Sequence, residues 1–249
     1  MTPSRLQQEL GRKTPIWGGW ITGPTLMGPE EFARAGYDYV GFDAQHSYLD
    51  DTDIASMLRR LEHVPIATVV RLSSADPAPI GRVLDAGADG IVIAMIESAE
   101  QAAAGVAATR YPPTGVRSFG PLRASLGYDT AALEERVSVF AMIETAAALT
   151  DLARICAVPG LSGIYVGPAD LALSMGVDVR QSAGHPEVLD AIARIQRTAT
   201  AANRVTGIHA GTGVNGRAMA GLGYQMITLA AESQALRRGA AEFLKEASS

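Results

Sequence analysis

Lysine is the residue that this sequence most lacks, with nineteen arginines but only two lysines in 249 residues. Lys13 precedes the first strand-like run, and Lys245 lies in the last helix-like segment. A lysine that forms a Schiff base in an α/β barrel has to reach the carboxyl end of a strand, and neither lysine is placed there. We therefore expect neither Schiff-base aldolase chemistry nor a pyridoxal phosphate (PLP) cofactor.

Cysteine and long apolar runs are also scarce. Cys156 is the single cysteine, which excludes an internal disulfide, fits a reducing compartment and is expected to be a buried thiol. No run approaches the ~18 apolar residues that a membrane span requires, and the first residues lack the apolar stretch of a signal peptide. These absences predict a cytoplasmic protein without a membrane partner.

The charge pattern excludes a further class of partner. The net charge is −5, and the basic residues are scattered along the chain. A nucleic-acid-binding surface needs clustered positive charge, so we expect no nucleic-acid partner. A hydrophobic fraction of 47% with 19% charged residues is typical of an ordinary globular protein.

Short β-rich runs alternate with segments of helical period along the whole chain, and no linker divides it. The expected strands are Ile16–Ile21, Tyr37–Asp43, Ala67–Arg71, Gly90–Met95, Val137–Glu144, Ser162–Gly167, Val205–His209 and Tyr224–Leu229. The expected helices lie near Pro29–Ala35, Asp51–Glu62, Pro77–Ala86, Ser98–Thr109, Ala146–Cys156, Pro186–Asn203, Gly216–Gly221 and Ser233–Ala247. Eight βα units in about 250 residues predict one α/β domain over residues 1–249, a (β/α)8 TIM barrel with its active site at the carboxyl ends of the strands.

Two other features bear on this architecture. Gly36, Gly87 and Gly223 each follow a helix-like segment and precede a strand, as expected of a glycine in the left-handed conformation at a helix end. The segment 111–128 is a long connection rich in proline and glycine, and we expect it to be ordered near the rim of the barrel.

Acidic and other polar residues follow the apolar strands. Glu144 ends one strand and Asp170 follows another, and two carboxylates at one rim suggest a hard divalent cation. A purely structural role is the alternative for each: Asp170 would cap a helix, and Glu144 would be a carboxylate in the first turn of a helix. The other residues at or just beyond strand ends are Trp20, Asp43, His46, Arg71, His209, Glu97 and Glu232.

A glycine-rich motif gives a weaker signal. Residues 211–216 match G-x-G-x-x-G between a strand and a helix, with Glu232 about twenty residues further on. A dinucleotide-binding fold needs several more strands after such a motif, and too little chain follows. A phosphate-binding loop remains an alternative to a plain turn.

Several short motifs at the expected strand ends together resemble one family. They are Phe42-Asp43-Ala44-Gln45-His46, Val69-Val70-Arg71, Leu84-Asp85-Ala86-Gly87-Ala88, the run 111–117, Met142-Ile143-Glu144-Thr145 and Gly167-Pro168-Ala169-Asp170-Leu171. The sequence resembles the HpcH/HpaI aldolases, the metal-dependent class II pyruvate aldolases related to the citrate lyase β-chain.

The resemblance implies roles for named residues. It implies that Glu144 and Asp170 bind a divalent metal (Mg²⁺, Mn²⁺ or Co²⁺), that Arg71 faces the keto or enolate oxygen, and that Asp43 and His46 form a proton-transfer dyad. Asp85 is implied to be a polar support near a subunit boundary. The implied substrate-binding residues are Trp20, Gln45, Arg71, Gly167, Pro168 and Ala169. Members of the family are typically homo-oligomers, often hexamers built as trimers of dimers with exchanged C-terminal helices.

The implied reaction is the reversible cleavage of a 4-hydroxy-2-oxo acid to pyruvate, or a close analogue, and an aldehyde. A divalent metal and a guanidinium would both stabilise the enolate, and a histidine can accept the proton of the C4 hydroxyl. The alternatives are an oxaloacetate decarboxylase or acyl-CoA-type lyase on the same site, and a non-catalytic homologue that binds oxo acids. The last is suggested by Gln45, where the family usually has glutamate; Ala94 and Ser118 are further departures from the family pattern.

Overall fold

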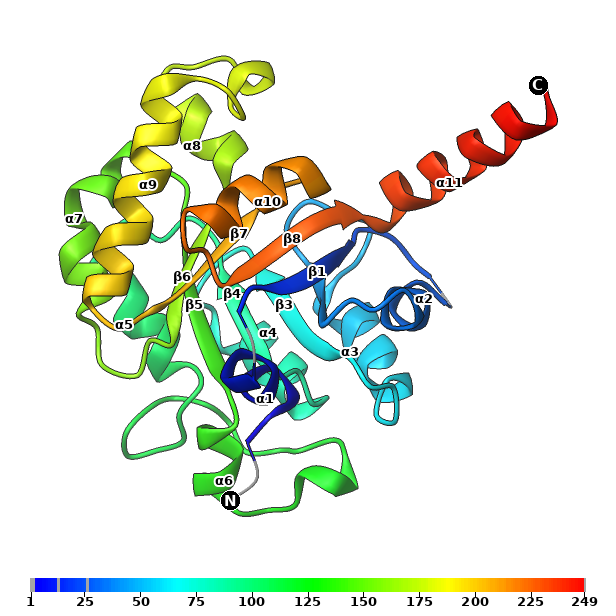
Figure 1. Cartoon of the computed structure of the whole chain (residues 1–249). Coiled ribbons are helices and arrows are strands. Elements are labelled where there is room, and N and C mark those ends of the chain that lie inside the picture. Colours follow the sequence, from blue (N-terminus) through cyan, green and yellow to red (C-terminus); the bar gives the residue numbers. More distant parts are fainter. Residues whose placement is uncertain (1–2, 13, 26, 249) are drawn as a thin grey trace.

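The structure, a computed structural model that describes residues 3–12, 14–25 and 27–248, contains a closed barrel of eight parallel strands. Each strand pairs with its neighbours in sequence, and β1 pairs with β8 (Figure 1). The strands are β1 (Ile16–Ile21), β2 (Tyr39–Asp43), β3 (Ala67–Leu72), β4 (Gly90–Ile93), β5 (Ser138–Ile143), β6 (Gly163–Val166), β7 (Val205–His209) and β8 (Met226–Ala231). The predicted (β/α)8 barrel is confirmed.

Helices surround the barrel and return the chain to the start of each next strand. They are α1 (Arg5–Arg12), α2 (Gly28–Arg34), α3 (Asp51–Arg60), α4 (Pro77–Asp85), α5 (Ala99–Ala107), α6 (Thr130–Glu135), α7 (Ala146–Cys156), α8 (Pro168–Ser174), α9 (Pro186–Ala201), α10 (Gly213–Gly221) and α11 (Glu232–Ala247). All eight predicted helices are present. Three helices were not among the predicted ones: α1 and α6, which precede β1 and β5, and α8, which follows β6.

Local signals explain where several helices begin and end. Asp50 accepts hydrogen bonds from the backbone at the start of α3, Asp76 does the same for α4, and Thr212 caps α10. Because Thr212 caps it, α10 begins three residues before the predicted Gly216. Gly87 has a φ of +100° after α4, which confirms the expected left-handed glycine at this helix end.

Side chains of each strand alternate between two cores. The outward-facing residues, such as Val40, Phe42 and Val70, pack against the helices. The inward-facing residues, such as Tyr39 and Tyr165, form a second cluster inside the barrel. The hydroxyl groups of both tyrosines lie within hydrogen-bond distance of Thr228 Oγ1, at 2.8 and 2.6 Å. The barrel interior is therefore a packed layer rather than a channel.

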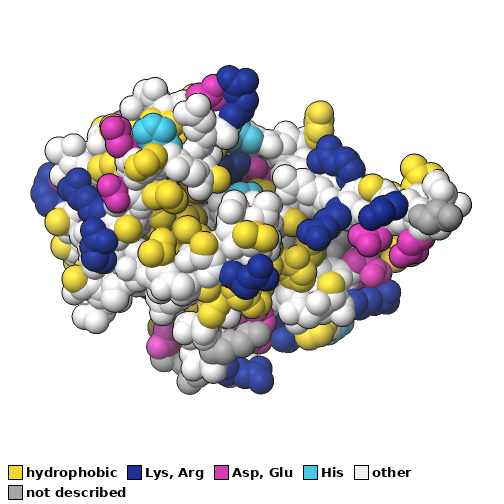
Figure 2. All heavy atoms as spheres, turned by 45° about the horizontal axis from the view of Figure 1, so that its top comes forward, with side chains coloured by type: hydrophobic (Ala, Val, Ile, Leu, Met, Phe, Trp, Pro, Cys, Tyr) yellow, Lys and Arg dark blue, Asp and Glu magenta, His cyan; other side chains and the backbone are white. Residues whose placement is uncertain are grey.

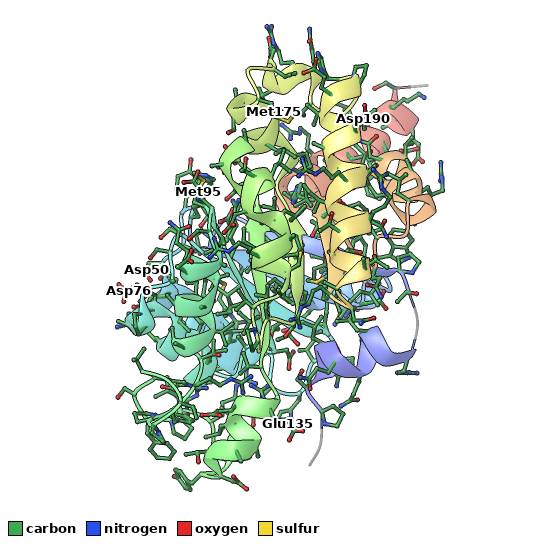
Figure 3. All side chains as sticks on the ribbon, turned by 90° about the vertical axis from the view of Figure 1, so that its left-hand side faces the viewer. Asp50, Asp76, Met95, Glu135, Met175 and Asp190 are labelled. Atoms are coloured by element: carbon green, nitrogen blue, oxygen red, sulfur yellow. The ribbon has the colours of Figure 1, made fainter. Side chains whose placement is uncertain are left out.

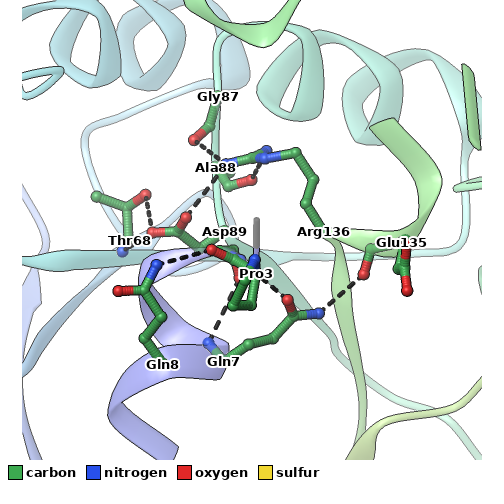
Figure 4. Close-up of polar contacts among 10 residues, drawn as sticks. Pro3, Gln7, Gln8, Thr68, Gly87, Ala88, Asp89, Glu135 and Arg136 are labelled. Carbon is green, nitrogen blue, oxygen red and sulfur yellow. Dashed lines mark hydrogen bonds and ion pairs between the residues drawn. The ribbon is translucent and has the colours of Figure 1, made fainter. Parts of the chain in front are cut away.

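The helix α1 covers the amino ends of the strands. Leu6 is fully buried and lies against Gly90 at the start of β4. Figure 4 shows the polar contacts at this end, among them the hydrogen bond of 2.9 Å from Gln7 Nε2 to the Glu135 carbonyl. In Figure 3, Glu135 lies at this end of the molecule, opposite Met175 and Asp190.

A buried ion pair at the same end of the barrel joins Asp89, just before β4, to Arg136, just before β5. Asp89 accepts hydrogen bonds from the Thr68 amide at 2.9 Å and from Arg136 Nη2 at 3.1 Å, and both side chains of the ion pair are largely buried. Burial raises the pKa of Asp89, although the charge of Arg136 acts in the opposite direction.

The segment 111–128 is ordered but lies at the other end of the barrel from the predicted one. The Tyr111 amide donates to Glu134 Oε1 at 2.6 Å, and the rings of Tyr111, Phe119 and Tyr128 lie in a row, with neighbouring centroids 5.7 and 6.2 Å apart. The expectation of a position near the active rim is wrong, because α5 has already returned the chain to the amino ends of the strands. Figure 1 shows this green segment beside α6.

The last helix stands apart from the barrel. None of its described residues is buried, and Leu236, Phe243 and Leu244 are 72%, 73% and 69% exposed. Figure 1 shows α11 extending away from the strands that precede it. None of the helices in the described part of the chain is long and apolar enough to cross a membrane. Cys156, as predicted, is buried.

We predict that Asp89→Ala lowers the free energy of unfolding by about 3 kcal/mol, because it leaves the Arg136 guanidinium buried without its carboxylate. Urea denaturation measures this change. Glu31→Ala, which breaks the exposed ion pair with Arg34, is the matched control and should have a much smaller effect. Equal losses in the two variants would contradict a structural role for the buried pair.

Candidate active site

The polar residues at the carboxyl ends of the strands occupy inward-facing positions. Trp20 follows the inward-facing Ile16 and Gly18 on β1, and Glu144 follows the inward-facing Phe140 and Met142 on β5. Since side chains of a strand alternate with a period of two, a residue two or four places beyond an interior residue also faces the interior. By the same alternation, inward-facing positions are occupied by Asp43, Arg71, Gly167 and His209.

Asp43 and Arg71 form an ion pair across neighbouring strands. They are register partners of β2 and β3, and their side chains are 2% and 10% exposed. Arg71 Nε donates to Asp43 Oδ1 at 2.9 Å, and Nη2 donates to Oδ2 in a second, short hydrogen bond. Burial alone would raise the pKa of Asp43, but the hydrogen bonds and charge of Arg71 outweigh it and lower that pKa below its ordinary value.

Trp20 completes this arrangement on the other side. Its Nε1 donates to Asp43 Oδ2 at 3.2 Å, and the Arg71 guanidinium carbon lies 5.7 Å from the centre of its ring. Tyr165 stacks on the same indole, with centroids 6.0 Å apart. The planar guanidinium is therefore held by a bidentate carboxylate and by an aromatic side chain.

His46 meets Asp43 through its backbone. Asp43 Oδ1 accepts the amide N–H groups of Gln45 at 2.9 Å and of His46 at 3.1 Å. No hydrogen bond joins the Asp43 carboxylate to the His46 ring in the described structure, where both carboxylate oxygens accept from Arg71, so the implied dyad stays a prediction. The His46 side chain lines the cavity described below, whereas Gln45 Oε1 is buried and has no hydrogen-bond partner among the described residues.

Glu144 has one satisfied and one unsatisfied carboxylate oxygen. The side chain is buried, and Oε1 accepts the Met95 amide at 2.7 Å. Oε2 is buried and finds no hydrogen-bond partner in the part of the chain that the structure describes. A Cβ atom at Gly167 would lie only 2.5 Å from Oε2, so the glycine keeps the space beside this oxygen open.

Asp170 lines the cavity described below and lies near enough to Glu144 for its charge to act on that carboxylate. It lies in the first turn of α8, where Gly167 rather than Asp170 is the N-cap, so the simple capping role is wrong. Burial is the main cause that raises the pKa of Glu144, and the charge of Asp170 contributes in the same direction. An unsatisfied buried oxygen beside a second carboxylate fits the oxygen ligands of a hard divalent cation.

These two carboxylates are not a complete set of ligands. No cluster of three or more potential metal-binding side chains of His, Cys, Asp or Glu occurs within residues 3–12, 14–25 and 27–248. A divalent cation with six or more positions would therefore take most of its ligands from water and substrate, as open catalytic sites do.

A cavity of about 640 Å³ lies above these residues. Its walls include Trp20, Asp43, Arg71 and the residues 167–170, so the predicted Pro168 and Ala169 are also brought to it. Figure 2 looks onto this face, where acidic, basic and histidine side chains gather in a hollow beside hydrophobic ones. The volume lies within the ~300–1,000 Å³ of typical small-molecule sites.

Two residues of the site had no predicted role. Tyr165 lies inside a strand rather than at its end, so a search limited to strand ends misses it. It is two residues before Gly167 and therefore also faces the barrel interior. His209 lies edge-on to Trp20, with ring centroids 5.6 Å apart. Burial, assisted by the charge of Arg71, lowers the pKa of His209 to about 4, so its imidazole is neutral at pH 7.

Asp85 is not brought to this cavity within one chain. It is the last residue of α4, which ends at the amino side of the barrel, and it forms an ion pair of 2.7 Å with the buried Arg117. Glu232 also has another partner, since its Oε1 accepts the Thr25 hydroxyl at 2.7 Å. Lys245 lies in α11, whereas Lys13 is outside the described residues.

We predict that His209 makes stability depend on pH. Between pH 6.5 and about 4 the unfolded chain binds a proton at this residue that the folded protein does not bind. Its stabilising contribution is complete above pH 6.5 and is lost as the pH falls towards 4. Wild-type protein should therefore lose about 2 kcal/mol more than His209→Gln between pH 7 and pH 4.5, measured by urea denaturation. His63→Gln is the control, and parallel curves for wild type and His209→Gln would contradict the prediction.

The chain is similar to proteins named as aldolases. It is 36% identical over 236 residues to a hydroxypyruvate/pyruvate aldolase from Rhizorhabdus wittichii, with 94% of each chain covered. It is 32% identical over 232 residues to a 4-hydroxy-2-oxo-heptane-1,7-dioate aldolase from Salmonella typhimurium, covering 91% of this chain and 88% of that protein.

The solved structures agree with these relatives. A HpcH/HpaI aldolase/citrate lyase family protein from Burkholderia cenocepacia superposes with a TM-score of 0.86 at 33% identity, covering 98% of this chain and 99% of that one. The family model described as HpcH/HpaI aldolase/citrate lyase matches residues 18–238, which include every strand except the first two residues of β1. The chain therefore belongs to the HpcH/HpaI aldolase/citrate lyase family.

Proposed function

We propose that this protein is a divalent-metal-dependent aldolase that reversibly cleaves a 4-hydroxy-2-oxo acid to pyruvate, or a close analogue, and an aldehyde. The observation that carries the proposal is the unsatisfied, buried oxygen of Glu144 near Asp170, which lines one cavity together with the fixed Arg71. Both relatives described above are named aldolases, which does not favour a decarboxylase, an acyl-CoA lyase or a non-catalytic homologue.

Glu144 and Asp170 hold the metal in this proposal. Their oxygen ligands suit Mg²⁺, Mn²⁺ or Co²⁺, and the open positions suit the carboxylate and keto oxygens of the oxo acid. Such an ion supplies Lewis-acid stabilisation of the developing enolate. Gly167, Pro168 and Ala169 line the cavity between the two carboxylate positions and complete the oxo-acid site.

Arg71 provides the fixed positive charge. Its Nε and Nη2 atoms are taken by Asp43, which leaves Nη1 as the nitrogen for the keto or enolate oxygen. Because Asp43 and Trp20 already hold the guanidinium, little reorganisation is needed when negative charge develops on that oxygen.

His46 is the proposed base for the C4 hydroxyl group. It is the exposed histidine of the cavity wall, and the hydrogen bond from its amide to Asp43 fixes the turn that carries it. Cleavage of the C3–C4 bond leaves its electron pair in the enolate while the C4 oxygen becomes the aldehyde carbonyl. Gln45 lies beside this turn and would tune the substrate end of the site through its amide.

We further propose a cytoplasmic homo-oligomer, a hexamer built as a trimer of dimers. Support comes from α11, whose exposed Leu236, Phe243 and Leu244 form an apolar face without a covering element in its own chain. Exchange of this helix between subunits would cover that face. Asp85 would then act as a polar support near a subunit boundary, which it cannot do for the cavity of its own chain.

We predict that treatment with a chelator abolishes aldol cleavage and that Mn²⁺, Co²⁺ or Mg²⁺ restores it. Glu144→Gln and Asp170→Asn should each weaken binding of Mn²⁺, measured by calorimetry, by about tenfold or more. Asp178→Asn changes an exposed carboxylate outside the cavity and is the matched control. Full activity of the metal-free enzyme would overturn the mechanism.

We predict that Arg71→Lys lowers kcat by about 100-fold, because one ammonium cannot both pair with Asp43 and reach the substrate oxygen. Binding of Mn²⁺ should change by less than about twofold, since Arg71 is not a ligand. Arg82→Lys, at the half-exposed ion pair with Asp51, is the control for the substitution itself. Comparable losses in kcat and in metal binding would mean that Arg71 only supports the structure.

A further inference from the structure

The charged and apolar residues of the active-site cavity come from different elements. Asp43 and Arg71 lie on β2 and β3, across the barrel from β7, and Asp170 lies on α8, which packs against α9. A second set of lining residues comes from α9, β7 and α10, and it includes neither an acidic nor a basic side chain apart from the imidazole of His209.

We call the apolar part of this set the apolar annex and define it by Leu189, Ile192, Ile208, Ala218 and Met219. Ile192, Ile208 and Met219 are buried, whereas Leu189 is half-buried and Ala218 is exposed at the entrance. In Figure 2, hydrophobic side chains gather on the α9 side of the hollow. The annex is therefore an apolar lining of the cavity, and its three buried residues also belong to the core between the barrel and the surrounding helices.

The few polar groups near the annex are weak partners for an anion. Asn215 Nδ2 donates to the Ala210 carbonyl at 3.2 Å, so one of its donors is already used. Among the described residues that line the cavity, Arg71 is the only arginine or lysine, and it is engaged by Asp43. A carboxylate placed in the annex would lose its hydration without gaining a cation.

His209 and Trp20 connect the two sets of residues. Both line the cavity, and Trp20 also contacts Asp43 on the charged side. The low pKa of His209 keeps its ring uncharged at neutral pH, which agrees with an apolar surface on the annex side.

We propose that the apolar annex binds the C4 substituent of the 4-hydroxy-2-oxo acid, and that this substituent is an uncharged alkyl or aryl chain. The aldehyde product of cleavage, and the aldehyde acceptor of the reverse reaction, is accordingly an apolar aldehyde. This inference rests on the proposed function, because the oxo-acid end has to lie against the charged residues.

The chemistry contrasts with that of a relative. The Salmonella typhimurium aldolase is named for a heptane-1,7-dioate, which has a second carboxylate at the end remote from the oxo acid. A second carboxylate on the substrate of the present protein would face the annex. Each methylene that the annex removes from water should instead raise kcat/KM by about fourfold.

The first test compares aldehydes of equal chain length in the aldol addition of pyruvate by the metal-loaded enzyme. We expect kcat/KM for butanal to exceed that for succinate semialdehyde by at least about tenfold. We also expect kcat/KM to rise from acetaldehyde through butanal to hexanal. Equal values for butanal and succinate semialdehyde, or a preference for the latter, would overturn the inference.

The second test changes the annex. Ala218→Phe fills the entrance and should lower the ratio of kcat/KM for hexanal to that for acetaldehyde by about tenfold. Val214→Phe places the same side chain on α10 at a position that is 69% exposed and does not line the cavity, so it should leave this ratio unchanged. Leu189→Arg adds a cation and should shift the preference towards succinate semialdehyde by about tenfold.

The outcomes separate the two proposals. In one outcome, Ala218→Phe still turns over acetaldehyde, and its ratio of kcat/KM for hexanal to that for acetaldehyde is unchanged. This outcome would leave the aldolase function intact and overturn the role of the annex. Absence of turnover with every aldehyde, in a wild-type enzyme that binds Mn²⁺, would overturn the proposed function itself. Circular dichroism melting curves show whether each variant is folded when its ratio is measured.

Discussion

The buried ion pair between Asp43 and Arg71 is the interaction on which the site depends. Two charges can remain inside the barrel only because each satisfies the other, and adjacent, in-register strands supply them at the right separation. The pair fixes the guanidinium, positions the turn at His46 through backbone amides, and draws in Trp20. Because Arg71 is engaged by Asp43, its charge only partly offsets the two carboxylates of Glu144 and Asp170, and this imbalance favours a divalent cation.

The barrel controls where these groups can act. Tyr39, Tyr165 and Thr228 form a hydrogen-bonded layer that fills the interior below the ion pair, and α1 covers the amino ends of the strands. Substrate can therefore approach only from the carboxyl ends. The two ends of the barrel have different tasks. At the amino end, polar residues such as Asp89 and Arg136 pair with one another, whereas at the carboxyl end Glu144 keeps an unsatisfied oxygen.

Chemistry and specificity are also divided within the cavity. The residues proposed for metal binding, enolate stabilisation and proton transfer lie on β3 and α8 or directly after β2 and β5, while the apolar annex lies on α9, β7 and α10. Because the annex is supplied by a helix face and a late strand, its lining can change without disturbing the ion pair. This separation is consistent with a family in which relatives are named for different oxo acids.

The eight βα units, the barrel and the strand-end residues could be predicted from the sequence, because short apolar runs and helix-ending glycines such as Gly87 are local signals. Which of these groups meet depends on the three-dimensional arrangement. It pairs the Asp43 carboxylate with Arg71, places Asp85 and the segment 111–128 at the far end of the barrel, and adds Tyr165 to the cavity. Strand register and the direction of each returning helix set these distances, and a linear pattern of residues contains neither.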